Sequence, residues 1–135
     1  MAQHHVPTGF SALTPYLQLE GAAGFISFAQ AAFGATIRMK HADGDTLIHG
    51  EVVIEGCVLE LSEARPEWPA TRSALHLYVP DCDAAHARAV AAGAAEVHAP
   101  MDQPYGERSS AVRDRWGNDW FIATVTDMNA RTGGS

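Results

Sequence analysis

Three residues whose types could do chemistry together lie near a tight turn predicted at residues 55–56: His49, Glu51 and Glu60. A two-residue turn there would pair Glu51 with Glu60 across two antiparallel strands, so that both side chains point to the same face. An imidazole beside two carboxylates could act as a general acid and base, hold a divalent cation or a ligand, or contact only water. These three residues are therefore the candidate catalytic group.

The predicted hairpin separates a polar face from an apolar face. Counting outward from the turn pairs Ile54 with Cys57, Val53 with Val58, Glu51 with Glu60, and His49 with Ser62. One face should then be apolar and pack under a helix; it carries Ile48, Val52, Ile54, Cys57, Leu59 and Leu61. The other face should be polar; it carries His49, Glu51, Glu60 and Ser62.

Two opposed carboxylates on one face need compensation, because Glu51 and Glu60 would repel by up to about 1 kcal/mol in water. A shared proton, a cationic partner such as His49 or Arg113, the positive group of a ligand, or a metal cation could each supply it. Solvation of both carboxylates on an open face is the alternative.

The elements that position this group follow from apolar periodicity. Residues 13–19 alternate, with Leu13, Leu17 and Leu19 on one side, which predicts a half-buried strand. Apolar residues at helical spacing predict a helix over 22–35 that Gly34 ends. A strand over 36–41 and the hairpin complete a β-α-β-β-β module.

The same order then repeats at a spacing of roughly 60 residues. A strand over 73–81 alternates, a helix over 83–94 starts at a cap from Asp81 or Asp83, and Gly93 ends that helix. Three further strands are predicted, over residues 95–99, 109–114 and 119–125. The sequence thus predicts an α+β fold of tandem modules, at about 10–62 and 73–126, with a linker at 63–72 and flexible termini at 1–9 and 127–135.

Composition narrows the class of protein. The 135 residues suffice for a packed core, and the net charge of −7 disfavours a nucleic-acid partner. The chain lacks an apolar run long enough for a membrane span, and its first residues do not resemble a signal peptide. Cys57 and Cys82 are expected to be free thiols, so we expect a cytoplasmic protein that does not bind membranes.

Five short motifs carry a resemblance to a known family. They are Pro15-Tyr16-Leu17, Phe33-Gly34-Ala35, His49-Gly50-Glu51, Tyr105-Gly106-Glu107-Arg108, and the run from Asp114 to Thr124. With the module order, they resemble the glyoxalase, bleomycin-resistance and extradiol-dioxygenase (vicinal oxygen chelate) superfamily, and within it the PhnB-like branch. The resemblance covers about residues 10–126 as a single domain, and it implies a curved, cup-shaped mixed sheet with the helices outside.

The resemblance also bears on metal binding. Metal-dependent members bind one divalent cation with four side chains, and on this sequence the four positions fall on Thr14, Glu60, Ala74 and Phe121. A methyl and a phenyl group cannot ligate zinc, nickel or iron, so the usual metal centre is not expected. The alternative is a displaced divalent metal held by Glu60 with His49, Glu51 or His76.

A cup with Ala74 and Phe121 at former ligand positions favours a flat or bulky organic molecule. The expected ligand-binding residues are Thr14, Tyr16, Gln18, His76, Tyr78, Arg108, Arg113 and Phe121. Either arginine could meet an anionic group or instead hold its own loop through Glu107 or Asp114. Phe121 should face the cup, while Trp120 and Ile122 face the helix as core.

Three functional hypotheses follow. The chain could sequester a small, drug-like or aromatic molecule, as in the bleomycin-resistance part of the family. It could instead be a lyase or isomerase that uses the cup carboxylates and histidines, with or without a displaced metal. It could also be a binding or regulatory module without turnover. The resemblance implies a homodimer in each case.

Overall fold

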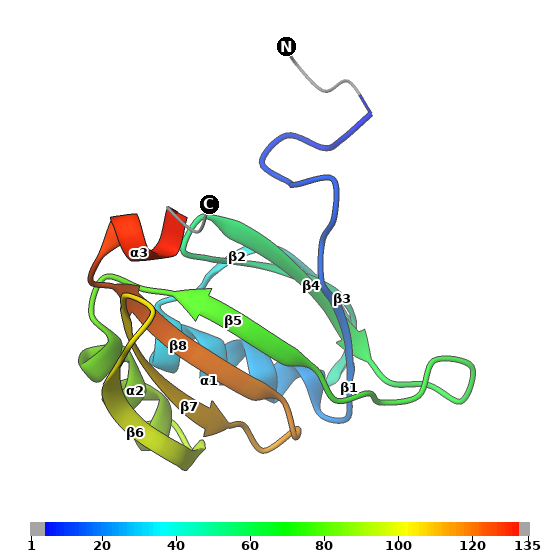
Figure 1. Ribbon diagram of the computed structural model, residues 1–135. Helices are drawn as coiled ribbons and strands as arrows, with labels where there is room; N and C mark the ends of the chain where they lie inside the picture. Colours follow the sequence, from blue (N-terminus) through cyan, green and yellow to red (C-terminus); the bar gives the residue numbers. More distant parts are fainter. Residues whose placement is uncertain (1–4, 133–135) are drawn as a thin grey trace. The chain divides into compact units, whose positions relative to one another are not determined.

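The structure is a computed structural model, and it describes residues 5–132. The chain divides into two compact units. The first holds Gly34–Thr71 with the chain before Ala31, and the second holds Ala31–Phe33 with the chain from Arg72 onward. Each unit carries one four-stranded mixed sheet (Figure 1). The α+β class and the repeated β-α-β-β-β order are therefore confirmed.

The first unit contains the predicted hairpin. Its elements are β1 (Tyr16–Leu19), most of α1 (Ala22–Phe33), β2 (Thr36–Asp43), β3 (Thr46–Ile54) and β4 (Cys57–Glu63). The strand order is β1-β4-β3-β2, with β1 parallel to β4 and the other neighbours antiparallel. The two central strands are thus those that carry His49, Glu51 and Glu60.

The register of the hairpin is confirmed from its turn to Glu51. Glu55 and Gly56 both have positive φ, at 47° and 79°, as the tight hairpin turn requires. The ladder pairs Ile54 with Cys57, Val53 with Val58, and Glu51 with Glu60, and it runs on to Gly50 and Leu61. Ser62, expected opposite His49, pairs with Gln18 of β1 and donates its hydroxyl to the Gln18 amide oxygen at 3.0 Å.

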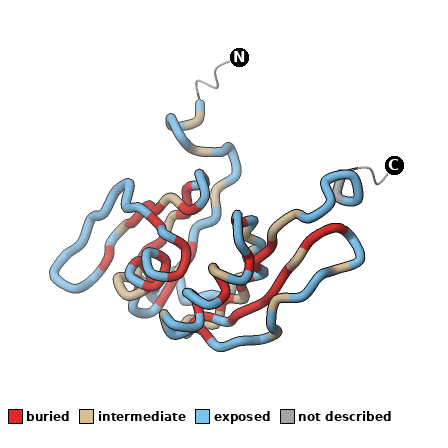
Figure 2. The backbone as a smooth tube through the Cα atoms, turned by 90° about the vertical axis from the view of Figure 1, so that its left-hand side faces the viewer, coloured by how far each residue is buried: buried red, intermediate tan, exposed pale blue. Residues whose placement is uncertain are grey.

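The apolar face of the hairpin is buried except at Ile48 and Cys57. Val52 and Leu61 are fully buried, and Ile54 and Leu59 nearly so. The expectation of a fully covered face was wrong for Ile48, which is 41% exposed, and for Cys57. The β2–β3 ladder shifts register between His41 and Ala42, so that Leu47 rather than Ile48 takes the buried place near Gly50 and Ile26 of α1. Cys57 lies directly after the hairpin turn. Figure 2 shows the same separation between buried stretches and exposed connections.

Helix α1 is capped differently at its two ends. Gly21 at its start offers no side chain, and Glu63 of β4 instead accepts the backbone N–H of Gly21 at 2.9 Å and of Ala22 at 3.0 Å. Gly34 ends the helix in the left-handed region, as predicted. Glu63, placed in the linker by sequence, is therefore part of the fold that fixes α1 to the sheet.

The first strand is shorter than predicted. Leu13 was expected to share a buried face with Leu17 and Leu19, but it is 90% exposed and precedes β1. Pro15 explains the shortening, because it has no N–H to donate to a ladder. Its carbonyl still accepts the N–H of Glu60 at 3.0 Å, so the chain enters β1 beside the candidate site.

The second unit repeats the scheme. Its elements are β5 (Ala74–Tyr78), α2 (Cys82–Ala91), β6 (Ala95–Gln103), β7 (Glu107–Arg113) and β8 (Asp119–Val125), in sheet order β5-β8-β7-β6. Asp81 caps α2, which packs on β6, β7 and β8 (Figure 1). The tail expected to be disordered instead begins with a short helix, α3 (Met128–Thr132). No helix within residues 5–132 is long and apolar enough to cross a membrane.

One buried carboxylate organises the turn between β7 and β8. Asp114 is 3% exposed and accepts the backbone N–H groups of Trp116 at 3.0 Å and Asn118 at 2.9 Å. Its other oxygen accepts the indole N–H of Trp120 at 2.9 Å. Since a buried donor without an acceptor is costly, this turn depends on Asp114.

Asp114→Ala should lower the free energy of unfolding by about 2 to 4 kcal/mol, because several buried N–H groups lose a charged acceptor. Urea denaturation measures the loss. Asp119→Ala is the matched control; it removes a partly exposed pair with Arg113 and should cost at most about 1 kcal/mol. Equal losses in the two variants would contradict the role assigned to Asp114.

Candidate functional site

The structure brings His49, Glu51 and Glu60 together on the polar face of the first sheet. We call these three residues the Glu-His-Glu cluster. His49 Nε2 lies 2.9 Å from Glu51 Oε2 and 3.6 Å from Glu60 Oε1. One donor atom from each residue lies within 4.8 Å of the others. The prediction that these three side chains lie together is thus confirmed.

Glu51 is the buried anion of the cluster, with a side chain only 8% exposed. Arg38 Nη1 donates to Glu51 Oε1 at 2.8 Å, and His49 takes the other oxygen. The hydrogen bond to His49 lowers the pKa of Glu51 below its ordinary value, and the Arg38 guanidinium adds to this effect against the opposing influence of burial. Glu51 is therefore ionised and held at both oxygens.

Arg38 reaches Glu51 through an irregularity in β2. The ladder between β2 and β3 shifts register between Ile37 and Met39, and Met39 is the ladder partner of Glu51. A bulge places an extra residue opposite one partner and redirects its side chain. Arg38 was not among the sequence candidates, because the position of a bulge cannot be read from alternation.

Tyr16 completes the polar face from β1. The parallel ladder pairs Tyr16 with Glu60, and the Tyr16 hydroxyl lies 3.1 Å from His49 Nδ1. Thr14, the first-strand position of the metal-dependent family pattern, lies before the strand and donates to the Ser11 carbonyl at 3.1 Å. The strand residue that pairs with Glu60 is Tyr16, two positions later.

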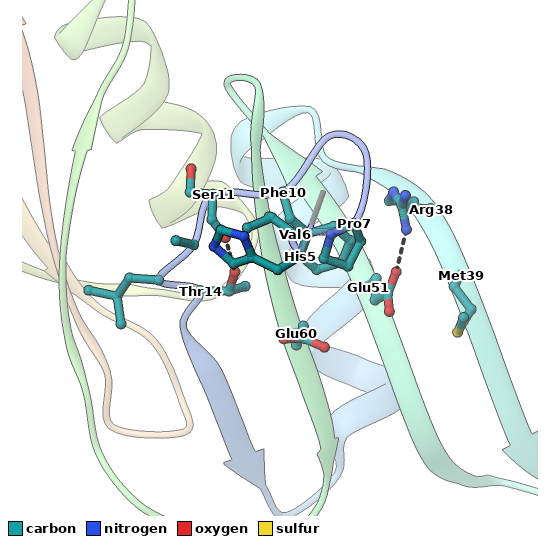
Figure 3. A pocket seen from close by; sticks show the side chains of 12 residues that line it. His5, Val6, Pro7, Phe10, Ser11, Thr14, Arg38, Met39, Glu51 and Glu60 are labelled. Atoms are coloured by element: carbon teal, nitrogen blue, oxygen red, sulfur yellow. Dashed lines mark hydrogen bonds and ion pairs between the residues drawn. The ribbon is translucent and has the colours of Figure 1, made fainter. Parts of the chain in front are cut away.

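A cavity of about 670 Å³ opens over this face. Its roof is the N-terminal segment, by which we mean residues 5–14, and its floor comes from β2, β3 and β4 (Figure 3). The lining residues are His5, Val6, Pro7, Phe10, Ser11, Ala12, Leu13, Thr14, Arg38, Met39, Glu51 and Glu60. The cavity thus joins an apolar roof to a charged floor.

Arg38 also binds the roof. Its Nη2 donates to the Thr8 carbonyl at 2.8 Å, and its guanidinium carbon lies 4.7 Å from the centre of the Phe10 ring. A guanidinium over an aromatic face is an attractive arrangement. One arginine therefore links the buried carboxylate of Glu51 to the N-terminal segment.

In the second unit, three of the expected ligand-binding residues form an aromatic group. The His76 ring centre lies 4.6 Å from that of Tyr78 and 6.4 Å from that of Phe121. Trp120 and Ile122 are buried, which confirms their predicted place in the core, and Phe121 is 40% exposed. The ladder sets His76, rather than Ala74, beside Phe121. His76 Nε2 also lies 3.5 Å from Glu107 Oε1.

The remaining candidates have structural partners. Arg108 donates to both oxygens of Asp83, at 2.7 and 3.2 Å, and to Asp102 at 3.3 Å. Its contact with Asp83 directs it toward α2. Arg113 donates to Asp119 at 2.7 Å, and Gln18 accepts from Ser62. These pairs, which differ from the expected Glu107 and Asp114, do not support an anion-binding role for either arginine.

A partly buried hydrogen-bonded group in the second unit was not among the predicted sites. His86 of α2 lies 2.8 Å from Ser110 Oγ and 2.6 Å from Glu96 Oε2. The three residue types resemble a nucleophilic triad, but Ser110 is fully buried and no substrate could reach its hydroxyl. These hydrogen bonds therefore fix α2 to its sheet.

Comparisons with known proteins place the chain in a family. The family model described as the Glyoxalase/Bleomycin resistance protein/Dioxygenase superfamily matches residues 19–122. The chain belongs to this superfamily. A Mycobacterium bovis relative, the uncharacterized protein Mb0911c, is 35% identical over 132 aligned positions, and the match covers 87% of this chain and 86% of the relative. The PhnB-like branch stays a prediction.

Solved structures share the fold at lower identity. TioX from Micromonospora sp. ML1 is 22% identical, with a TM-score of 0.72 over 84% of this chain and 95% of that chain. TnmS3, an antibiotic-binding protein from Streptomyces sp. CB03234, is 20% identical, with a TM-score of 0.66 over 85% of this chain and 98% of that chain. These matches show that the chain shares the fold of both proteins.

Arg38→Gln should loosen the N-terminal segment, because the segment loses the guanidinium contacts to Thr8 and Phe10. We expect chymotrypsin to cleave after Phe10 about tenfold faster, as the loss of a charged hydrogen bond predicts. Time-resolved limited proteolysis with mass spectrometry measures the rate. Arg65→Gln, which removes an exposed pair with Glu67, is the control and should leave the rate unchanged. Unchanged cleavage in Arg38→Gln would show that Arg38 does not hold the segment.

Proposed function

We propose that the protein binds and sequesters a small drug-like or aromatic molecule in the cavity between the N-terminal segment and the polar face of the first sheet. The cavity itself carries the proposal. Its volume of about 670 Å³ falls in the range typical of ligand pockets. An apolar wall with a few fixed polar groups is also the composition that such pockets share.

The lining indicates the chemistry of the ligand. Phe10, Pro7 and Met39 offer apolar surface suited to a ring system. Glu60 opens onto the cavity, has a side chain 23% exposed, and makes only a loose 3.6 Å pair with His49. Its carboxylate can therefore accept from a hydrogen-bond donor or a basic nitrogen on the ligand.

Family membership supports the proposal without fixing the ligand. The superfamily includes bleomycin-resistance proteins, and the antibiotic-binding TnmS3 has the same fold. We propose further that binding does not use the four-ligand metal centre of the metal-dependent members. Phe121 stands at one expected ligand position and has no donor atom, whichever first-strand residue is its neighbour.

A lyase or isomerase is the second candidate, and the position of His49 favours it. The imidazole lies between two carboxylates, with the Tyr16 hydroxyl on its far nitrogen, so a proton could pass along these groups. Catalysis would show as a new product when a bound ligand is incubated with the protein. A sequestering protein returns the ligand unchanged.

A homodimer in the cytoplasm is also part of the proposal. The family resemblance suggests the dimer, and two free cysteines suit a reducing compartment. Light scattering on the eluted peak of a gel-filtration column measures the mass. A monomer at micromolar concentration would contradict the dimer.

Glu60→Gln should weaken binding of the tightest ligand from a panel of aromatic and cationic natural products. We expect a loss of about tenfold or more, because a charged hydrogen bond becomes a neutral one. Phe10→Ala should also weaken binding, through lost apolar contact. Isothermal titration calorimetry measures both.

Glu55→Gln is the matched control, since Glu55 lies exposed in the hairpin turn. Its affinity should equal that of the unchanged protein. Absence of any saturable ligand in the panel, or equal affinity of the Glu60 and Glu55 variants, would count against this cavity as the binding site.

A further inference from the structure

We propose that the Glu-His-Glu cluster is a binding site for a first-row divalent transition metal such as Mn²⁺ or Zn²⁺. The proposal goes beyond the proposed function and does not depend on it, since it concerns the metal alone. It shares only Glu60 with the four positions expected from the family. The other two ligands, His49 and Glu51, come from the neighbouring strand β3.

The distances within the cluster suit one shared ion. Metal bonds of about 2.1 Å place neighbouring donor atoms roughly 3 to 3.5 Å apart. The two distances from His49 Nε2 lie just on either side of this range, 2.9 Å to Glu51 Oε2 and 3.6 Å to Glu60 Oε1. All three donor atoms lie within 4.8 Å of one another, so a small rotation of Glu60 would bring them around a common centre.

The contacts outside the three donor atoms are those that metal ligands usually have. A ligating histidine commonly donates its other ring N–H to an oxygen, and the Tyr16 hydroxyl lies 3.1 Å from His49 Nδ1. A ligating carboxylate is commonly held by a further donor, and Arg38 holds Glu51 Oε1 at 2.8 Å. Nε2 of His49 and Oε2 of Glu51 are thereby directed toward Glu60.

Charge and donor type select the class of metal. Two carboxylates against the single guanidinium of Arg38 leave a net negative site when the imidazole is neutral, which favours a dication. One nitrogen and two oxygen donors suit manganese, iron or zinc better than a soft thiolate-seeking ion. Three protein ligands also leave coordination positions open, and Glu51 and Glu60 line the cavity of the first unit.

Calorimetric titration of the full-length, untagged, chelator-stripped protein with MnCl₂ and with ZnCl₂ tests the site. We expect one saturable ion per chain. His49→Gln and Glu60→Gln should each weaken binding by at least about tenfold, and Tyr16→Phe by about tenfold through the orientation of His49. His98→Gln and Glu55→Gln are matched controls outside the cluster and should bind as the unchanged protein does.

Two outcomes would overturn the proposal. One is the absence of saturable binding to the folded protein. The other is binding that persists at full affinity in His49→Gln and Glu60→Gln, which would assign the ion to other histidines of the chain. Urea denaturation without metal establishes that each variant folds. If His49→Gln does not fold, Glu60→Gln decides the question, because its carboxylate is partly exposed and its substitution keeps shape and size.

Discussion

The burial of the Glu51 carboxylate is the constraint on which the first unit depends. A buried charge is tolerated only when it is paired and hydrogen-bonded, and Glu51 meets this condition through Arg38 on one oxygen and His49 on the other. The bulge in β2 lets Arg38 reach one oxygen of Glu51, and the contact with the other oxygen orients the His49 ring. The hydrogen bonds that compensate the buried charge of Glu51 therefore hold the Glu-His-Glu cluster in place.

Arg38 also links Glu51 to the N-terminal segment. Arg38, whose Nη1 contacts Glu51, donates from Nη2 to the Thr8 carbonyl and lies over the Phe10 ring. The N-terminal segment is thus held by the same arginine that pairs with the Glu51 carboxylate. Binding and stability are coupled at this point, because a ligand that displaces the roof exchanges contacts of Arg38 for contacts of its own.

The two units use one scheme for different surfaces. In each, the first strand lies parallel to the last, and the ladder places a first-strand residue beside the position that resembles a family ligand. The first unit sets Tyr16 beside Glu60, and the second sets His76 beside Phe121. The first of these surfaces is polar and carries the candidate site, whereas the second is aromatic.

Local rules were sufficient to predict much of this arrangement. The Glu55-Gly56 turn set the pairing of Glu51 with Glu60, because a two-residue turn leaves a single register. Alternation in β8 separated buried Trp120 from exposed Phe121, because successive side chains of a strand point to opposite faces.

Features that depend on distant contacts were not predictable. Arg38 joins the site through a bulge, and alternation assumes an unbroken ladder. Ile48 is exposed because the β2–β3 ladder shifts register beside it and Leu47 takes the buried place, and alternation does not reveal such a shift. The exposure of Leu13 could have been expected from Pro15, which lacks the N–H that a longer first strand would use.

Binding of a ligand between the N-terminal segment and the Glu-His-Glu cluster can be followed by two-dimensional ¹H–¹⁵N NMR of the labelled protein, titrated with the tightest ligand of the panel. We expect the amide signals of Phe10, Arg38 and Glu60 to shift together and to saturate at one affinity. Saturable shifts confined to residues of the second unit, around His76 and Phe121, would contradict it.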